Sequence, residues 1–440
     1  MPKALLTDLY ELTMAYSYFK RGVNTRAVFD LFVRPPVPYR RFLVFAGLES
    51  VLTYLESLRF EDEDLAYLDS LGLFDRGFLD YLAGFRFTGD VWSVAEGEIV
   101  FPGEPLITVE APRIEAQIVE TYLLNTVNYE TLIASKAARV LLAAGPDASV
   151  VDFSPRRDHG EDAAMKAARS SYLAGFEGTS NTQAGQRFGI PVVGTMAHSY
   201  VMSFPDELTA FRAFAEDHPS PILLIDTYDT LTGLEHAIQV ARELEAKGRR
   251  LVGVRLDSGD LAALSRRVRA RLDEAGLPYV KIFVSGDLDE YKIRDFKAAG
   301  GTAWGYGVGT RLGTSYDLPA LGGVYKLVMD AEGPRIKKSP GKVTLPGQKQ
   351  VWRGPEGDVV SLRHEVHPGR PLLAQVMEEG RRRVPPPDLA ALRQRTREAL
   401  FGLPEELRII DRPEAPDYPV AVSPALLELQ KNTRSGSSPV

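Results

Sequence analysis

Polar residues that could do chemistry follow short apolar runs in the middle of the chain. Arg156 and Arg157 come after VVDF, and either could grip an anion through its guanidinium fork or form a structural salt bridge. Because they are adjacent, we expect their side chains to point different ways and to have different tasks. His198, in GTMAHS after another run, is a candidate for proton transfer, against the alternative of a satisfied polar residue. His159, in RRDHG, is the weaker candidate.

Two glycine-rich turns predict a site for a phosphate group. Ser285 and Gly286 belong to SGD, and Gly309 and Thr310 to GVGT, each following an apolar run. Glycines let backbone N–H groups approach an anion closely, and hydroxyls stand beside them. We expect a helix to begin behind the first turn. Either turn alone could be an ordinary turn, but two on successive strands predict a phosphate cradle.

Two carboxylates in RLDSGD could serve a phosphorylated sugar. Asp257 and Asp260 have the hard oxygen ligands that bind Mg²⁺ or ribose hydroxyls. For Asp260 the alternative is a helix N-cap, since a short polar residue before a helical pattern often has that role.

The segments around these residues alternate between short apolar runs and helical stretches. We expect parallel strands with crossover helices, because each run is followed by a helical pattern. The runs are apolar almost throughout, which favours burial on both faces, as in an α/β barrel; a doubly wound open sheet is the alternative. Barrel enzymes place their sites at the carboxyl ends of the strands, where these polar loops stand. The runs are 150–153, 190–195, 222–226, 251–257, 281–285 and 304–309.

The ends of the chain have other patterns. Residues 7–22 predict a helix with a capping box at Asp8 and Glu11, and its apolar stripe leaves Tyr10 off the buried face. That stripe consists of Leu9, Leu12, Tyr16 and Phe19. Residues 85–110 predict short strands in a small antiparallel or mixed unit, and residues 114–144 a helical segment.

Beyond residue 328 the pattern is irregular. We interpret 379–388 as a linker or surface loop and 431–440 as a disordered tail.

Composition limits the class of protein. The chain has 440 residues and a net charge of −7, without a long run of basic residues, which argues against a nucleic-acid track. It has no cysteine, which excludes disulfides and thiolate metal sites and suits a reducing interior or a hot environment. No segment approaches the roughly 20 apolar residues that span a bilayer. We therefore expect a cytoplasmic enzyme with no membrane and no nucleic-acid partner.

Taken together and in order, seven segments resemble nicotinate phosphoribosyltransferase over most of residues 5–330. The segments are TDLYELTMAYSYFKRG, VFAGLE, RRxxG at 156–160, SSYLAGFEGTSNTQAG, GTMAHSYVMSF, GVRLDSGDL and GGVYKLV. The resemblance implies an incomplete α/β barrel of the type II phosphoribosyltransferase kind, with an N-terminal α/β sandwich domain and a C-terminal extension. We set the boundaries at 1–130, 131–330 and 331–440. It also implies a homodimer with shared active sites.

The implied reaction joins nicotinate to 5-phosphoribosyl diphosphate, forms nicotinate mononucleotide and pyrophosphate, and is coupled to ATP hydrolysis, in NAD biosynthesis. The family motif makes His198 the residue that ATP phosphorylates. Thr195 and Arg255 match nicotinate-binding residues, and Tyr10 matches the tyrosine that stacks on the pyridine ring. Thr310 matches a residue at the 5-phosphate.

The implied chemistry leads to a hypothesis about charge. Mg²⁺, Arg156 and Arg157 take up the charge that develops on pyrophosphate, while Asp257 holds the ribose and its positive centre. His198, Asp257 and Arg156 are thus the catalytic candidates, with Asp257 and Asp260 as tentative magnesium ligands.

Several alternative hypotheses differ in the substrate or in the class of protein. A nicotinamide-using relative would share the fold, but no acidic residue in GTMAHS is available to accept an amide N–H. Quinolinate phosphoribosyltransferase would need more cations for a second carboxylate. A non-catalytic nucleotide sensor could dispense with His198, and a phosphate-binding barrel isomerase would release no pyrophosphate. The absence of cysteine also excludes the zinc site of some relatives.

Overall fold

The chain forms two compact units, each built from segments that are separated in sequence. The computed structural model describes residues 4–339, 341–410 and 417–435. Of these residues, the first unit comprises 4–135, 320–339, 341–392 and 417–435, and the second 136–319 and 393–410. The sequence had predicted three consecutive segments instead. Most of the residues after 330 belong to the first unit, where β17 pairs with β3 from the N-terminal part of the chain, while 393–410 belong to the second unit.

The first unit is organised around an antiparallel sheet in the order β13-β12-β1-β5-β3-β17-β18. β5 lies between β1 and β3 and is buried almost along its whole length. The strands are β1 (Arg26–Val33), β3 (Asp90–Ser93), β5 (Pro105–Pro112), β12 (Gly323–Asp330), β13 (Gly333–Pro334), β17 (Ala374–Glu378) and β18 (Arg381–Arg382).

Two smaller sheets and several helices complete this unit. β2 (Leu43–Val44) pairs with β4 (Ile99–Val100), and a four-stranded sheet has the order β16-β14-β15-β19. Its strands are β14 (Lys349–Gly354), β15 (Gly357–Leu362), β16 (Arg370–Pro371) and β19 (Val420–Val422). The helices are α1 (Leu9–Arg21), α2 (Leu48–Ser57), α3 (Asp62–Ser70), α4 (Arg76–Ala83), α5 (Arg113–Ile118) and α17 (Pro424–Ser435). α6 (Glu120–Ala144) and α15 (Leu389–Phe401) contribute residues to both units.

A buried ion pair connects the C-terminal part of the chain to the first sheet. Lys349 on β14 lies 2.8 Å from Asp30 on β1, and both side chains are almost wholly buried. Lys349 also donates to the Leu345 carbonyl, at 2.8 Å. Burial lowers the pKa of Lys349, while Asp30 acts against that effect. Removal of either partner would leave a buried charge uncompensated, so the pair fixes β14 to the N-terminal strand.

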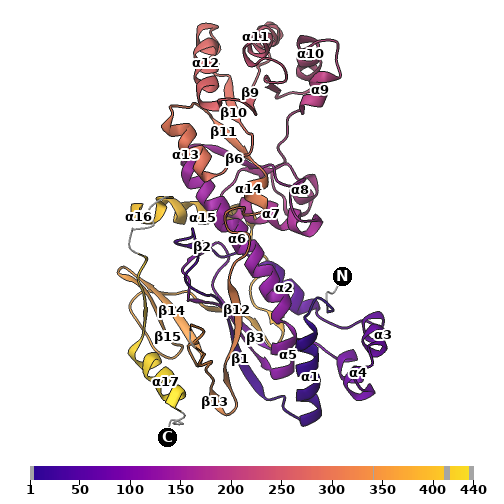
Figure 1. The fold of residues 1–440 in the computed structure, drawn as a ribbon, viewed down its shortest axis with the longest axis vertical. Helices are drawn as coiled ribbons and strands as arrows, with labels where there is room; N and C mark the ends of the chain where they lie inside the picture. Colours follow the sequence, from indigo (N-terminus) through magenta and orange to yellow (C-terminus); the bar gives the residue numbers. More distant parts are fainter. Residues whose placement is uncertain (1–3, 340, 411–416, 436–440) are drawn as a thin grey trace. The chain divides into compact units, whose positions relative to one another are not determined.

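The second unit contains the parallel strands that the sequence predicted. Their order is β7-β6-β11-β10-β9-β8, and in Figure 1 β9, β10, β11 and β6 lie side by side. Consecutive strands are neighbours, and the last, β11, pairs with the first, β6, as in a barrel; a doubly wound sheet would reverse its order midway. No pairing joins β8 to the β7 side among the described residues, so the barrel is incomplete. The strands are β6 (Ser149–Asp152), β7 (Gly178–Thr179), β8 (Ile222–Leu224), β9 (Gly253–Leu256), β10 (Lys281–Val284) and β11 (Gly305–Val308).

Aspartates start the crossover helices and thereby set the length of the loops at the strand ends. Asp206, Asp229, Asp260 and Asp289 each accept a hydrogen bond from the backbone N–H three residues later. Such N-caps satisfy donors that the first helical turn leaves free. The helices of the unit are α7 (Glu161–Leu173), α8 (Thr182–Phe188), α9 (His198–Met202), α10 (Glu207–Asp217), α11 (Thr230–Ala246), α12 (Leu261–Glu274), α13 (Glu290–Ala298), α14 (Thr310–Gly313) and α16 (Glu405–Arg408).

Two predictions about the N-terminal helix were wrong in detail. Asp8 makes no side-chain cap bond, and Glu11 is buried, where Thr7 and Thr121 donate to its carboxylate. The capping box is absent because the Asp8 N–H donates to the Thr121 hydroxyl and not to Glu11, and that hydroxyl also contacts the Asp8 carboxylate. Leu9 is half exposed, so it does not belong to the buried stripe, whereas Tyr10 is exposed as expected.

Three other segments differ from their prediction. Residues 190–195 form only a single bridge, from Thr179 to Val192, since Pro191 has no N–H to donate. In 379–388, β18 pairs with β17, so this is not simply a loop. In 431–440, residues up to Ser435 continue α17, so the disordered tail is wrong there. Residues 436–440 lie outside the described residues.

Candidate active site

Two adjoining cavities lie at the carboxyl ends of the barrel strands. The larger has a volume of about 430 Å³ and the smaller about 280 Å³. Both are lined by Phe153, Arg156, Arg255 and Asp257. The larger adds Arg157, Ser285, Gly286, Asp287, Gly307, Gly309 and Thr310, and the smaller adds Ser180, Gly194, Thr195, Met196, Ala197, His198 and Leu224. Rim loops that are far apart in sequence therefore converge on one site, as predicted.

The predicted phosphate cradle is a wall of the larger cavity. Gly286 has a φ of +105°, and a Cβ added there would lie 2.1 Å from the Asp257 carbonyl oxygen, so only glycine fits. A Cβ on Gly309 would come within 3.1 Å of the Phe153 carbonyl oxygen. α13 begins after the first turn, as expected, and α14 begins at Thr310. Close approach of backbone to a ligand is thus possible at both turns.

Both arginines of the pair line the larger cavity, and Arg156 also lines the smaller one. Both lie in the turn after β6, and the expectation that their side chains point different ways stays a prediction. Neither side chain has an ion-pair partner among the described residues. The larger cavity therefore offers two uncompensated cations to an anionic ligand.

The arginine pair is carried by a loop that buried carboxylates hold in place. Asp152, at the end of β6, accepts from the Ser154 N–H at 2.8 Å and from the Thr179 hydroxyl at 2.7 Å. Ser154 in turn donates through its hydroxyl to Asp158 at 3.0 Å. Burial, with the charge of Asp152, raises the pKa of Asp158 to about 6.

Arg255 is the centre of the polar cluster where the two cavities meet. Its guanidinium donates to Ser285 at 2.8 Å, to Thr195 at 3.2 Å and to Asp257 at 2.6 Å. It also lies over the ring of Phe153, 5.5 Å from the centroid. One side chain thus joins the wall that holds Thr195 to the wall that holds the cradle.

Asp257 is held in its charged form. Burial by itself raises the pKa of Asp257, but the Ser285 hydroxyl, the Arg255 guanidinium and nearby His198 together hold that pKa below its usual value. Its backbone N–H donates to Asp226, at 2.8 Å. The cavity junction therefore presents a cation and an anion side by side.

His198 is the first residue of α9 and lines the smaller cavity. Its Nδ1 lies 3.1 Å from the hydroxyl of Thr227, a residue of the loop after β8. That contact fixes the ring, with the donor and acceptor roles depending on the tautomer.

Comparisons with known proteins identify the family of this site. The nicotinate phosphoribosyltransferase N-terminal domain model matches residues 5–128, the nicotinate phosphoribosyltransferase family model matches residues 148–326 and the C-terminal domain model matches residues 348–430. The chain belongs to the nicotinate phosphoribosyltransferase family. It is accordingly a phosphoribosyltransferase of NAD biosynthesis.

Named relatives agree with the family models along the whole chain. A nicotinate phosphoribosyltransferase of Mycobacterium tuberculosis is 49% identical over 428 residues, which cover 96% of this chain and 91% of the relative. That of Bacillus subtilis is 43% identical over 462 residues, covering 96% and 93%. The crystal structure of human nicotinic acid phosphoribosyltransferase matches with a TM-score of 0.85 and 31% identity, covering 97% of this chain and 99% of the human chain. The incomplete barrel predicted from the sequence is thus the fold of a nicotinate phosphoribosyltransferase.

Three residues proposed from the sequence do not line either cavity. Asp260 is the N-cap of α12 and accepts from the Ala263 N–H at 3.0 Å, which is the alternative role considered for it. His159 is exposed on the arginine loop. Tyr10 belongs to the first unit, where it is 46% exposed, and burial and then Glu120 raise its pKa.

Several site residues were missed. Phe153 and Asp287 line the larger cavity, while Asp226 and Thr227 hold Asp257 and His198. The signal for Asp226 and Thr227 was present, since DTYDT follows an apolar run as the other rim loops do. Nothing in that pattern distinguished these residues from Asp229, which only caps α11.

The cavities contain few ligands for a metal ion. Among the described residues there is no group of three or more histidine, cysteine, aspartate or glutamate side chains that could hold one. Asp257 and Asp287 line the larger cavity, each already paired with a cation. Such a donor set fits Mg²⁺ only if the substrate supplies most of the oxygens, which is usual for magnesium bound with phosphates.

A search of the described helices for a membrane-spanning segment found none that is both long and apolar enough.

Proposed function

We propose that the chain transfers the phosphoribosyl group of 5-phosphoribosyl diphosphate to nicotinate, with release of pyrophosphate and coupled hydrolysis of ATP. The observation that supports this most directly is the pair of adjoining cavities with Arg255 and Asp257 at their junction. The larger cavity has the glycines and unpaired arginines that suit a phosphorylated sugar. The smaller cavity, of about 280 Å³, suits the planar base. A sugar and a planar base held in them would meet where the charged pair stands.

Nicotinate occupies the smaller cavity in this proposal. Its carboxylate is recognised by Arg255, whose guanidinium already donates toward Thr195 at 3.2 Å. Nicotinamide has no charge for that arginine, so the acid is preferred. Tyr10, exposed on α1, would stack on the pyridine ring from a partner subunit of a homodimer.

5-Phosphoribosyl diphosphate occupies the larger cavity. Its 5-phosphate lies against Gly309 and Thr310, with Ser285 and Gly286 on the neighbouring turn. Arg156 and Arg157 are uncompensated, so they bind the pyrophosphate and take up the charge it gains as it leaves. Mg²⁺ bound to the pyrophosphate and Asp257 would add to that charge stabilisation.

The chemical step demands positioning rather than covalent work by the protein. The bond between C1 of the ribose and the pyrophosphate oxygen breaks, and its electron pair leaves with pyrophosphate. The pyridine nitrogen donates its lone pair to C1 from the opposite face. Asp257, kept ionised by Arg255 and Ser285, stabilises the positive charge that develops on the ribose.

His198 accepts the γ-phosphoryl group of ATP, which leaves ADP. Since Nδ1 faces Thr227, we assign the phosphoryl group to Nε2. A phosphohistidine beside the smaller cavity adds negative charge there and can order the substrate loops; its hydrolysis returns the free histidine and phosphate. The absence of cysteine supports our further proposal that the enzyme works in the cytoplasm.

The test is product formation from 5-phosphoribosyl diphosphate and Mg²⁺ with nicotinate or nicotinamide, each with and without ATP. We expect nicotinate mononucleotide selectively, formed faster with ATP. His198→Ala should lose the acceleration by ATP, while His159→Ala, at the exposed histidine of the arginine loop, serves as the control and should keep it. No pyrophosphate with either base would contradict the proposal.

A further inference from the structure

One arginine bridges the two loops that form the phosphate cradle. The first loop is 285–289, between β10 and α13, and the second is the turn at Gly309 and Thr310, where β11 leads into α14. The two strands are parallel neighbours in the sheet. Arg311, the second residue of α14, reaches from the second loop's end to the first loop. The spacing of the cradle therefore depends on a side chain as well as on the strands.

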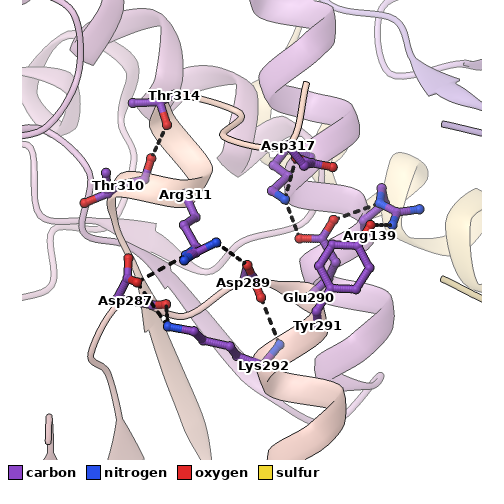
Figure 2. A network of polar contacts seen from close by, with 11 residues as sticks. Arg139, Asp287, Asp289, Glu290, Tyr291, Lys292, Thr310, Arg311, Thr314 and Asp317 are labelled. Carbon is purple, nitrogen blue, oxygen red and sulfur yellow. Dashed lines mark hydrogen bonds and ion pairs between the residues drawn. The ribbon is translucent and has the colours of Figure 1, made fainter. Parts of the chain in front are cut away.

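The guanidinium of Arg311 contacts two carboxylates at once (Figure 2). Its Nε lies 3.2 Å from Asp287 and its terminal nitrogen 3.1 Å from Asp289. The guanidinium also lies over the Tyr316 ring, 4.7 Å from the centroid. Arginine suits this position because its planar fork has several donors in fixed directions, which a lysine lacks.

One of these carboxylates is firmly anchored. Asp289 is buried and caps α13 by accepting from the Lys292 N–H at 2.8 Å. The next residue, Glu290, is wholly buried and lies 2.6 Å from Lys136 and 2.9 Å from Arg139, both on α6. The start of α13 is thus fixed by buried charges, and Arg311 is attached to that fixed point (Figure 2).

The other carboxylate belongs to the cradle itself. Asp287 lines the larger cavity and has a φ of +51°, in the left-handed region that non-glycine residues seldom adopt. Lys292 donates to both its carboxylate, at 3.0 Å, and its carbonyl, at 2.8 Å. Such a backbone conformation persists where surrounding contacts hold it, and here those contacts are Arg311 and Lys292.

Arg311 itself is not among the residues that line either cavity. Its charge is opposed by two carboxylates, unlike that of Arg156 or Arg157. A role as a direct ligand of the substrate is therefore not what its contacts favour.

We propose that Arg311 is a positioning residue for the phosphorylated sugar: it sets the spacing of the two cradle loops by bridging Asp287 to the anchored Asp289. The inference rests on the proposed function, in which 5-phosphoribosyl diphosphate occupies the larger cavity. Hydrogen bonds from backbone N–H groups depend steeply on distance, so a shift of either loop weakens all of them together.

The experiment measures three variants in the full chain. Arg311→Gln removes the charge and the fork, and Arg311→Lys keeps the charge but lacks the fork. Arg271→Gln is the control, because Arg271 is bonded through two nitrogens to Glu235 on the outer helices, with the shorter contact at 2.6 Å. Binding of 5-phosphoribosyl diphosphate with Mg²⁺ is measured by calorimetry, and KM is measured for each substrate.

We expect Arg311→Gln to weaken binding of the phosphorylated sugar and raise its KM by about tenfold, with Arg311→Lys in between and the KM for nicotinate within about twofold of wild type. Binding by Arg311→Gln or Arg311→Lys that matches the Arg271→Gln control would overturn the inference, as would an equal rise in both KM values. If Arg311→Gln does not fold, Arg311→Lys decides by the same criteria. A wild type that binds the sugar but forms no product contradicts the proposed function alone, because binding is measured separately.

Discussion

Two carboxylates in different units of the molecule show how surroundings decide whether a buried acid keeps its charge. Asp257, at the barrel rim, has a guanidinium at 2.6 Å and a serine hydroxyl beside it, and its pKa lies below the usual value. Glu11, on α1, has only the hydroxyl and backbone donors of Thr7 and Thr121, and burial raises its pKa to about 7. Hydrogen bonds from neutral groups do not offset desolvation at Glu11, whereas an added cation does at Asp257.

Asp257 thus has the charge that catalysis needs, whereas Glu11 makes structural contacts only. A charged carboxylate at the cavity junction can stabilise a developing positive charge throughout the neutral pH range. A carboxyl group with a pKa near neutrality changes its charge within that range, so we expect the stability of the helix that carries Tyr10 to depend on pH. The following predictions test each side of this difference.

The largest effect is expected from Asp257→Asn. The amide keeps the shape and an acceptor for Arg255 but loses the negative charge, so turnover should fall by about a hundredfold while the KM for nicotinate changes by less than about threefold. Asp273→Asn is the control, since Asp273 pairs with Arg269 on the exposed side of α12. Steady-state kinetics with each substrate varied provide the measurement. An equal loss in turnover and nicotinate affinity would refute the role given to Asp257.

Gly286→Ala tests whether the reaction tolerates a shift of the backbone at Gly286 or Asp257. The new Cβ would meet the Asp257 carbonyl, so we expect kcat/KM for 5-phosphoribosyl diphosphate to fall by about thirtyfold or more. Gly276→Ala is the matched control, because Gly276 also has a positive φ, of +74°, but no atom lies within 4 Å of the new Cβ. It should lose about 1 kcal/mol of stability and no substrate affinity. Similar kinetics for the two variants would show that the close approach at Gly286 has no functional importance.

Glu11→Gln tests the other side of the comparison. Because the pKa of Glu11 is raised in the folded state, its contribution to stability is present below the unfolded pKa and is lost as pH rises toward about 7. Relative to wild type, Glu11→Gln should therefore gain stability between about pH 5 and pH 8, by on the order of 2 kcal/mol. Urea unfolding at several pH values measures this.

Glu63→Gln, on the exposed side of α3, controls for the loss of a carboxyl group. The same pH dependence in wild type and Glu11→Gln would mean that Glu11 does not titrate in this range.

The smallest effect is expected from Asp260→Ala. Loss of the N-cap should cost about 1 kcal/mol of stability and leave the Mg²⁺ dependence of the reaction unchanged. Asp229→Ala removes the equivalent cap of α11 and is the control. A higher Mg²⁺ requirement in Asp260→Ala alone would restore the metal-binding role first considered for this residue.

Local patterns predicted most of the barrel. Five of the six apolar runs contain a strand, because a buried parallel strand needs little beyond an apolar run with turn residues at its ends. β7 was missed because its two residues, Gly178 and Thr179, leave no pattern. The run at 190–195 was overestimated because Pro191 cannot donate to a ladder.

In the candidate site, too, some residues could be predicted from local patterns and others could not. Thr195, His198 and Asp257 were found because they stand at or after strand ends and match the family's motifs, whereas Arg255, within β9, was found from the motif alone. Asp226 and Asp229 stand in the same loop and have the same side chain, yet one holds Asp257 and the other caps a helix. Only the turn of the backbone between them determines which carboxylate faces the site.

The polar residues at the strand ends, the glycines of the cradle and the family could all be predicted from the chain alone, because they depend on local spacing and motif. The tertiary structure alone decided that β11 pairs with β6, that Lys349 returns to Asp30, and that Arg156 and Arg157 share a cavity. It also decided that Glu11 is buried without a cation while Asp257 has one. These properties depend on contacts between residues far apart in the chain, since burial and pairing are set by packing and not by the residues on either side.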